Sequence, residues 1–294
     1  MKHIVLFLYF SLTSIVTLGQ SKLQYNLNKG KVFTIKQTAQ QIITQQIDSA
    51  SHIITNNISG VLEFKVIEEI NDNYKIALSF KDLNLDISSS IQGVLMSVKA
   101  KEVIEGDMQS KIFNAILNTP VEIILSKTGN ILEATGGDSL VNKMTFASGL
   151  EDKFSLNMMR KSLEKEFGSE ALSNSYKQLT HIYTEEKVSV GETWENEYQG
   201  KLTTKNSWTL DKLTETNATI SGKATVIMNV VDPATTMKLS GTQETSITTD
   251  IASGFILKMK VEGFSEGFST SVQMGNIEIP TTISSTITYE LIKE

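Results

Sequence analysis

The side chains best suited to metal binding or acid–base catalysis are few and widely separated in this sequence. His52 and His181 stand alone, without the His-Glu-x-x-His spacing of a zinc site. Asp82, Asn84 and Asp86 alternate along one face of an expected strand, which suits oxygen ligands for Ca²⁺, but a calcium loop also needs a glycine and a distal glutamate. We therefore expect no metal site and no cofactor, and we assign the three polar residues to a solvated strand face.

The sharpest catalytic motif is Gly137-Asp138-Ser139-Leu140, which matches the serine signature of one lipase and esterase family. Such a serine needs a histidine as general base, which that family places near the C-terminus. No histidine follows His181 here, and residues 178–180 lack the partner aspartate. We therefore expect no catalytic residue in this motif, and we expect Asp138 to be a helix N-cap.

Two glutamate doublets, Glu68-Glu69 and Glu185-Glu186, are the candidates for glycoside chemistry. Neighbours on a strand point to opposite faces, so neither doublet forms a catalytic pair by itself. Sugar sites also present aromatic platforms, and only Trp194 and Trp208 are available. We expect Trp194 in the core and Trp208 partly exposed. The sequence thus favours a protein that is not an enzyme.

Composition excludes further classes. The chain of 294 residues has a net charge of −6 and a single arginine, Arg160, which disfavours nucleic-acid binding. It has no cysteine, which removes thiol catalysis, Cys-ligated zinc and iron–sulfur sites. A partner of another kind remains open: an apolar small molecule or lipid, or a protein of the cell envelope.

The N-terminus has the pattern of a secretory signal peptide. Met1-Lys2-His3 precede an apolar run over residues 4–18, and Gly19 offers a small residue at the cleavage point. The run is short for a membrane span. We expect cleavage near Gly19, export to the periplasm or the extracellular space, and no membrane span after cleavage.

Strand patterns occupy most of the remaining chain. Alternation of apolar and polar residues predicts a strand over residues 31–47, and a left-handed turn is expected at Asn71-Asp72-Asn73. The apolar parity changes near Lys81-Asp82, which predicts a β-bulge. Runs of this length must coil, so we expect a strongly curved antiparallel sheet.

Helical spacing predicts a short helix capped by Asp107 and a longer helical insert. We expect an α+β protein, mostly antiparallel and strongly curved, in two related halves with the insert packed on the sheet. The segments are a signal peptide (1–19), an N-terminal β half (20–136), the helical insert (137–184) and a C-terminal β half (185–294), forming one structural unit. Whether the halves are a true duplication is left open.

A family resemblance rests on two stretches. Residues 114–125, Asn-Ala-Ile-Leu-Asn-Thr-Pro-Val-Glu-Ile-Ile-Leu, with the Thr128-Gly129 turn, and residues 188–194, Val-Ser-Val-Gly-Glu-Thr-Trp, resemble an uncharacterised domain of exported bacterial proteins common in Bacteroidota. The resemblance covers nearly the whole mature chain and brings no catalytic residues. It implies an architecture similar to the lipoprotein carriers, in which a curved sheet wraps around helices and encloses an apolar cavity.

The leading hypothesis is a non-enzymatic binding protein for an apolar or lipid-like ligand. The alternative is a structural or protein-interaction module of the cell envelope without a small-molecule pocket, and a hydrolase is the least favoured function. The apolar stripes of the helical insert supply the candidate ligand lining, which is Met144, Phe154, Met158, Leu163, Leu172 and Tyr176.

Overall fold

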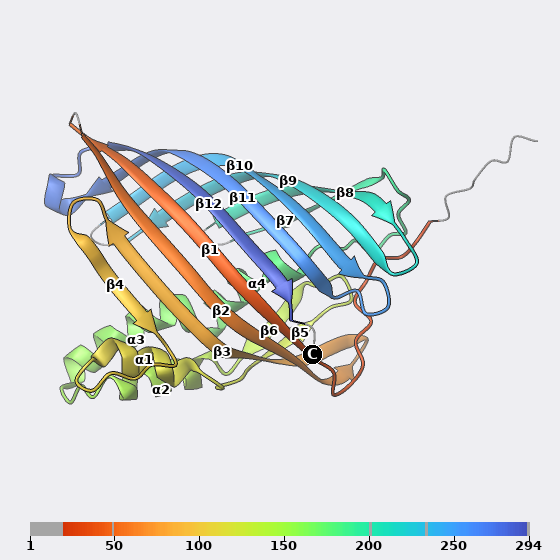
Figure 1. Ribbon diagram of the computed structural model, residues 1–294, viewed down its shortest axis with the longest axis horizontal. Coiled ribbons are helices and arrows are strands. Elements are labelled where there is room, and N and C mark those ends of the chain that lie inside the picture. The colour runs from red at the N-terminus through yellow and green to blue at the C-terminus, as the bar shows by residue number, and fades with distance from the viewer. Residues whose placement is uncertain (1–19, 49, 200–201, 233–234, 293–294) are drawn as a thin grey trace, which may run out of the picture.

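One antiparallel sheet organises the chain in the computed structural model, which describes residues 20–48, 50–199, 202–232 and 235–292. Within these residues the strand order is β6-β5-β3-β2-β1-β12-β11-β10-β9-β8-β7, and β4 pairs with β3 beside this path (Figure 1). The strands are β1 (Val32–Ile47), β2 (Ala50–Ile70), β3 (Asn73–Ser89), β4 (Gly93–Lys99), β5 (Val121–Leu125), β6 (Ile131–Thr135), β7 (Thr193–Tyr198), β8 (Leu202–Leu213), β9 (Asn217–Val231), β10 (Thr235–Asp250), β11 (Ile256–Ser271) and β12 (Ile279–Leu291). The helices are α1 (Met108–Ile116), α2 (Gly137–Ala147), α3 (Lys153–Phe167) and α4 (Ser169–Thr180), with a short 3₁₀ turn η1 (Val272–Met274).

Strands β1 and β12, the first and last in the described residues, pair in the middle of this sheet. Strand β1 runs antiparallel to β12 from Ile35 opposite Leu291 to Gln45 opposite Thr281. An unpaired strand edge would expose its backbone donors and acceptors, and this pairing satisfies them. The expectation of an α+β protein in two related halves is therefore wrong. The described chain is mostly antiparallel β structure in one continuous curved sheet.

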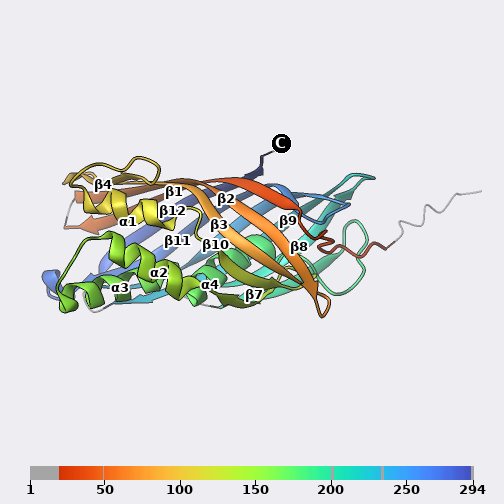
Figure 2. The same ribbon diagram turned by 90° about the horizontal axis from the view of Figure 1, so that it is seen from below.

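The sheet is strongly curved, and the helices lie along its inner side (Figure 2). Helix α4 contacts β6 and β7, the two edge strands of the path, while α1 contacts β4. The last residues of α4 join these edges by hydrogen bonds. The Thr180 hydroxyl donates to the Gly129 carbonyl (2.7 Å), and the His181 carbonyl accepts from Asn196 Nδ2 (2.7 Å) and the Tyr198 hydroxyl (2.6 Å). The end of α4 therefore fixes the distance between the two edges.

Local signals set the helix starts, with one correction. Asp107 caps α1 by accepting from the backbone N–H groups of Gln109 and Ser110, as the sequence predicts. Asp138 lies in the first turn of α2, where a carboxylate interacts favourably with the helix dipole. The N-cap of that helix is Gly136 in the left-handed conformation, so the predicted cap at Asp138 is wrong by two residues.

The hydrophobic core occupies one end of the sheet and includes the segment before β1. Leu23, Tyr25 and Leu27 are buried there, and the Tyr25 hydroxyl donates to the Thr180 carbonyl (3.0 Å). The Tyr25 N–H donates to the Lys127 carbonyl (2.9 Å), and the neighbouring N–H at position 26 donates to the Ser253 carbonyl (2.8 Å). This segment thus closes one end of the sheet. The predicted signal peptide, residues 1–19, lies outside the described residues.

Every tyrosine in the described residues is buried, which predicts a sharp alkaline transition. Burial raises the pKa of Tyr289 to about 12 and raises the pKa values of Tyr25, Tyr176, Tyr183 and Tyr198 further. Their folded-state pKa values exceed the unfolded value near 10, so their contribution to stability is complete below pH ~10 and falls as pH rises. We expect phenolate absorbance at 295 nm to appear together with loss of circular dichroism. Ionisation of most tyrosines before unfolding would contradict the buried placement.

Candidate functional site

The residues predicted to line a ligand site fall into separate environments. Met144, Leu172 and Tyr176 are buried in the core, and Leu163 packs against it from α3. Phe154 and Met158, one turn apart on the same helix, keep 76% and 56% of their surface exposed. The structure therefore brings four of the six toward the common core and leaves two on the surface.

The candidate catalytic residues are also dispersed. Ser139 is exposed on the first turn of α2, and the His181 side chain lies beyond the end of α4, tilted against the Tyr198 ring at 6.0 Å between centroids. His52 lies on the sheet, where its Nε2 and the Ser89 hydroxyl form a hydrogen bond (2.9 Å). In the described part of the chain, no group of three or more His, Asp or Glu side chains is placed to hold a metal ion.

His181 predicts an acid-sensitive contribution to stability. Burial lowers the pKa of its ring, and the nearby Lys177 ammonium lowers it further. The folded pKa lies below the unfolded value near 6.5, so the contribution is complete above pH ~6.5 and decreases as pH falls toward the folded pKa.

We expect the His181→Gln variant to show a flatter decline of unfolding free energy between pH 7 and pH 5 in urea titrations. His52→Gln is the control, and it should retain the wild-type decline because His181 is still present. Equal flattening in both variants would contradict this assignment.

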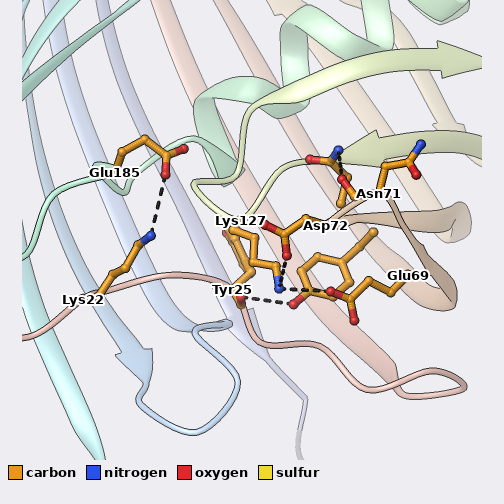
Figure 3. A network of polar contacts seen from close by, with 9 residues as sticks. Lys22, Tyr25, Glu69, Asn71, Asp72, Lys127 and Glu185 are labelled. Carbon is orange, nitrogen blue, oxygen red and sulfur yellow. Dashed lines mark hydrogen bonds and ion pairs between the residues drawn. The ribbon is translucent and has the colours of Figure 1, made fainter.

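A polar network holds the closed end of the sheet together. Lys127, in the β5–β6 turn, lies between Asp72 (Nζ–Oδ1 2.9 Å) and Glu69 (Nζ–Oε1 3.0 Å), close to Tyr25 (Figure 3). These hydrogen bonds, with Asp72 first, raise the Lys127 pKa, so the ammonium stays charged. The Lys127, Glu69 and Asp72 side chains thus form ion pairs that join the β5–β6 turn to the β2–β3 turn, which favours a structural role for them.

The other end of the sheet, here called the distal half, presents a different inner surface. It comprises residues 39–47 of β1, 50–58 of β2, 83–89 of β3, 196–198 of β7, 202–206 of β8, 224–231 of β9, 235–243 of β10, 263–271 of β11 and 279–287 of β12. Successive side chains alternate between faces, so its helix-facing positions are those that alternate in phase with the buried core residues of the same strands. On β3 the bulge at Lys81-Asp82 changes the phase, and the residues opposite helix-facing positions of β2 there are 83, 85, 87 and 89. Register pairing links them across the whole sheet.

The helix-facing positions of the distal half carry no Asp, Glu, Lys or Arg in any described residue. Large aliphatic side chains such as Ile43, Ile58 and Leu85 occur there and are only half-buried. The outward positions of the same strands carry charged side chains, among them Lys205, Lys223, Lys238, Glu244, Glu262 and Glu266. An apolar, uncharged and incompletely covered surface is the composition expected of a site for an apolar ligand.

The polar groups on this face are largely paired with one another. Asn56 Nδ2 donates to Gln41 Oε1 (3.0 Å), and Gln45 Nε2 donates to the Ser269 hydroxyl (2.9 Å). Ser269 also hydrogen-bonds the Thr281 hydroxyl (2.7 Å). Because buried polar groups are costly without partners, this mutual pairing lets polar side chains lie beside an apolar ligand.

One cross-strand row on this face is rich in carboxamides. It runs through Asn56, Gln41, Gln243, Asn206 and Asn196, with Ser285, Gly263 and Ala224 between them. The row toward the core contains Ala39, Ile58, Leu85, Val261 and Ile287, and the row on the other side contains Ile43, Ile54, Val226, Ile283 and Tyr198. We call the first set the carboxamide row. It is a neutral polar band between two mainly apolar rows.

A groove leads from the surface toward this face beside α4. It has a volume of about 640 Å³ and lies between the α3–α4 junction and the β7–β8 edge, where Tyr198 and Leu202 contribute helix-facing side chains. Its outer wall is polar and includes Asp138, Glu164 and Glu170.

Trp208 is a residue that sequence reasoning misplaced. It was expected to be partly exposed, but only 2% of its surface is accessible. Its indole Nε1 donates to Asn196 Oδ1 (3.0 Å), and Gly222 on β9 leaves room for its ring, because a Cβ there would lie 2.4 Å from Trp208 Cζ3. The signal that could have placed Trp208 is the glycine opposite it on the neighbouring strand. That signal can be recognised only when the register of the two strands is known.

Comparisons with known proteins identify a family and a fold. The sequence profile of a family described only as being of unknown function matches residues 71–256. No curated protein matches the chain. Among the described residues, none of the helices combines the length and apolarity needed to cross a bilayer.

Among solved structures, lipovitellin, described under "lipid-protein interactions in lipovitellin", is similar with a TM-score of 0.51 at 11% identity, covering 91% of this chain and 26% of that one. The chain thus spans about a quarter of lipovitellin. An outer membrane channel from Pseudomonas putida F1 aligns with a TM-score of 0.25 at 8% identity, covering 91% of this chain and 97% of the channel. At these identities the likeness to lipovitellin concerns the fold alone, and the channel's score is too low to bear on it.

Proposed function

The chain belongs to this family of unknown function, DUF6263, and we propose that it is an exported, non-enzymatic binding protein for an apolar or lipid-like ligand. The ligand lies against the helix-facing surface of the distal half, and the cell compartment is the periplasm or the extracellular space. The apolar run at residues 4–18 supports export. Within the described residues the exposed Ser139 makes no hydrogen bond to either histidine, which supports a non-enzymatic role.

The observation that carries the proposal is the charge-free inner face. A lipid tail gains free energy when its apolar surface leaves water, at about 25 cal/mol per Å². Half-buried residues such as Ile43, Ile58 and Leu85 provide that apolar contact, and the Asn56 and Gln41 carboxamides beside them are joined by a hydrogen bond. The similarity of fold to lipovitellin, a structure described for its lipid–protein interactions, supports the ligand class by analogy.

A structural or protein-interaction module of the cell envelope is the second candidate function. Phe154 and Met158 favour it, because two large apolar side chains one turn apart on an exposed helix face suit a protein partner. Crosslinking in the native envelope distinguishes this function, since a specific partner at α3 should be lost in a Phe154→Ser/Met158→Ser variant that keeps ligand binding.

Native mass spectrometry tests the binding function directly. The mature chain is purified from a heterologous periplasm without detergent, and its intact mass is compared before and after solvent extraction. We expect an added mass on the order of a few hundred daltons, as for one lipid-sized ligand, that extraction removes. A chain that carries no ligand and fails to bind a dansylated undecanoic acid in saturable fashion would overturn the proposal.

A further inference from the structure

The carboxamide row has hydrogen-bonding groups that the protein itself does not use. The Gln243 carboxamide is half-buried and makes no hydrogen bond within the described residues. Gln41 accepts from Asn56 Nδ2, which leaves the Gln41 amino group and the Asn56 carbonyl oxygen without a side-chain partner. Donors and acceptors of both kinds therefore face the same inner surface as the neighbouring apolar rows.

The surroundings of these groups are uncharged. The rows on either side contain mainly aliphatic residues, and the helix-facing positions of the distal half have no Lys or Arg in the described chain to neutralise an anion. An ionised headgroup placed there would lose its hydration without a counter-charge, whereas a neutral hydroxyl or ester would exchange water for carboxamide hydrogen bonds.

We propose that the carboxamide row selects neutral amphiphiles, with an ester, amide or hydroxyl group at Gln41, Asn56 and Gln243 and apolar parts on the flanking rows. This inference rests on the proposed function and narrows its ligand class. Both a carbonyl acceptor and a hydroxyl donor on the ligand find partners, because a carboxamide offers one acceptor oxygen and two donor hydrogens.

The first experiment compares 1-monooleoylglycerol with oleate at pH 8, two ligands with the same hydrocarbon chain. Tryptophan fluorescence is the readout, because the Trp208 indole donates a hydrogen bond to Asn196, which belongs to the carboxamide row. We expect the wild-type chain to bind the monoglyceride at least tenfold more tightly than oleate. Equal affinities, or a preference for oleate, would overturn the inference.

The second experiment removes the row's free groups. Gln41→Leu/Gln243→Leu should weaken monooleoylglycerol binding about tenfold and leave oleate binding unchanged or stronger. Gln40→Leu/Thr242→Leu is the matched control on the outward face, where Gln40 Nε2 donates to Asn57 Oδ1 (3.0 Å) as its own pair across the same two strands. Equal losses in both double variants would overturn the inference.

The outcomes separate this inference from the function it narrows. If the wild-type chain binds both lipids with equal affinity, the selectivity is wrong and the lipid-binding function stands. If it binds neither lipid nor the dansylated undecanoic acid, both are wrong.

Discussion

The Ile58→Lys variant is expected to lose at least about two orders of magnitude of affinity for 1-monooleoylglycerol, because it places an ammonium beside the apolar part of a neutral ligand. Ile58 faces the helices between Ala39 on β1 and Leu85 on β3 and is half-buried. The aliphatic stem of lysine keeps apolar contacts at this half-buried position, so the fold should persist. Titration followed by tryptophan fluorescence measures the loss.

Ser59→Lys is the matched control for this change. Ser59 is the next residue on β2, and it faces outward opposite Thr38 and Asn84. The same charge at the same level of the sheet should leave affinity within about twofold of wild type, since it stays in water. If Ser59→Lys weakens binding as much as Ile58→Lys, the ligand does not lie on the inner face.

The second large effect is expected at Gly129, in the turn between β5 and β6. Its φ of +90° is strained for any residue with a Cβ, and a Cβ there would lie 1.8 Å from the Thr180 carbonyl oxygen. We expect Gly129→Ala to cost about 1–2 kcal/mol for the left-handed backbone and a further ~1–3 kcal/mol for overpacking. Urea unfolding of the purified variant measures the sum.

Gly191 provides a control in which only the backbone effect operates. It has the same φ of +90°, and nothing lies within 4 Å of its built Cβ. Gly191→Ala should therefore cost only about 1–2 kcal/mol. Equal costs at the two glycines would mean that α4 does not press on the β5–β6 turn as the structure has it.

Local features of the fold were predictable because the residues that cause them are neighbours in sequence. Asn71 and Asp72 both adopt positive φ at the predicted turn, and the register shift next to Asp82 confirms the predicted bulge. Asp107 caps its helix as expected. Each depends on side chains within a few residues of one another, which the sequence displays directly.

Strand partners were not predictable from the same information. Alternation indicates which side chains share a face, and it contains no information about which strand lies next to which. The pairing of β1 with β12 therefore could not be derived, and the sequence predicts two halves where the structure has one continuous sheet. The burial of Trp208 depends on the same register, because Gly222 makes room for it from the next strand.

The place of the candidate site was not predictable from the sequence. The helical stripes led to residues such as Met144 and Phe154, which the structure puts in the core and on the surface respectively. The carboxamide row cannot be recognised in the sequence, because Gln41, Asn196 and Gln243 come from segments that are far apart in the chain. A row across a sheet has a sequence signal only after every register is known.

The pairing of β1 with β12 also has a consequence for the order in which the molecule is made. Synthesis releases β1 long before β12, so one edge of β1 remains without its partner until residues 281–291 have been added. Contacts between segments so distant in sequence form slowly, since a long loop must close before they give any stabilisation. Folding speed should therefore be limited by the arrival of β12, and the unpaired edge of β1 is the place where two unfinished chains would join.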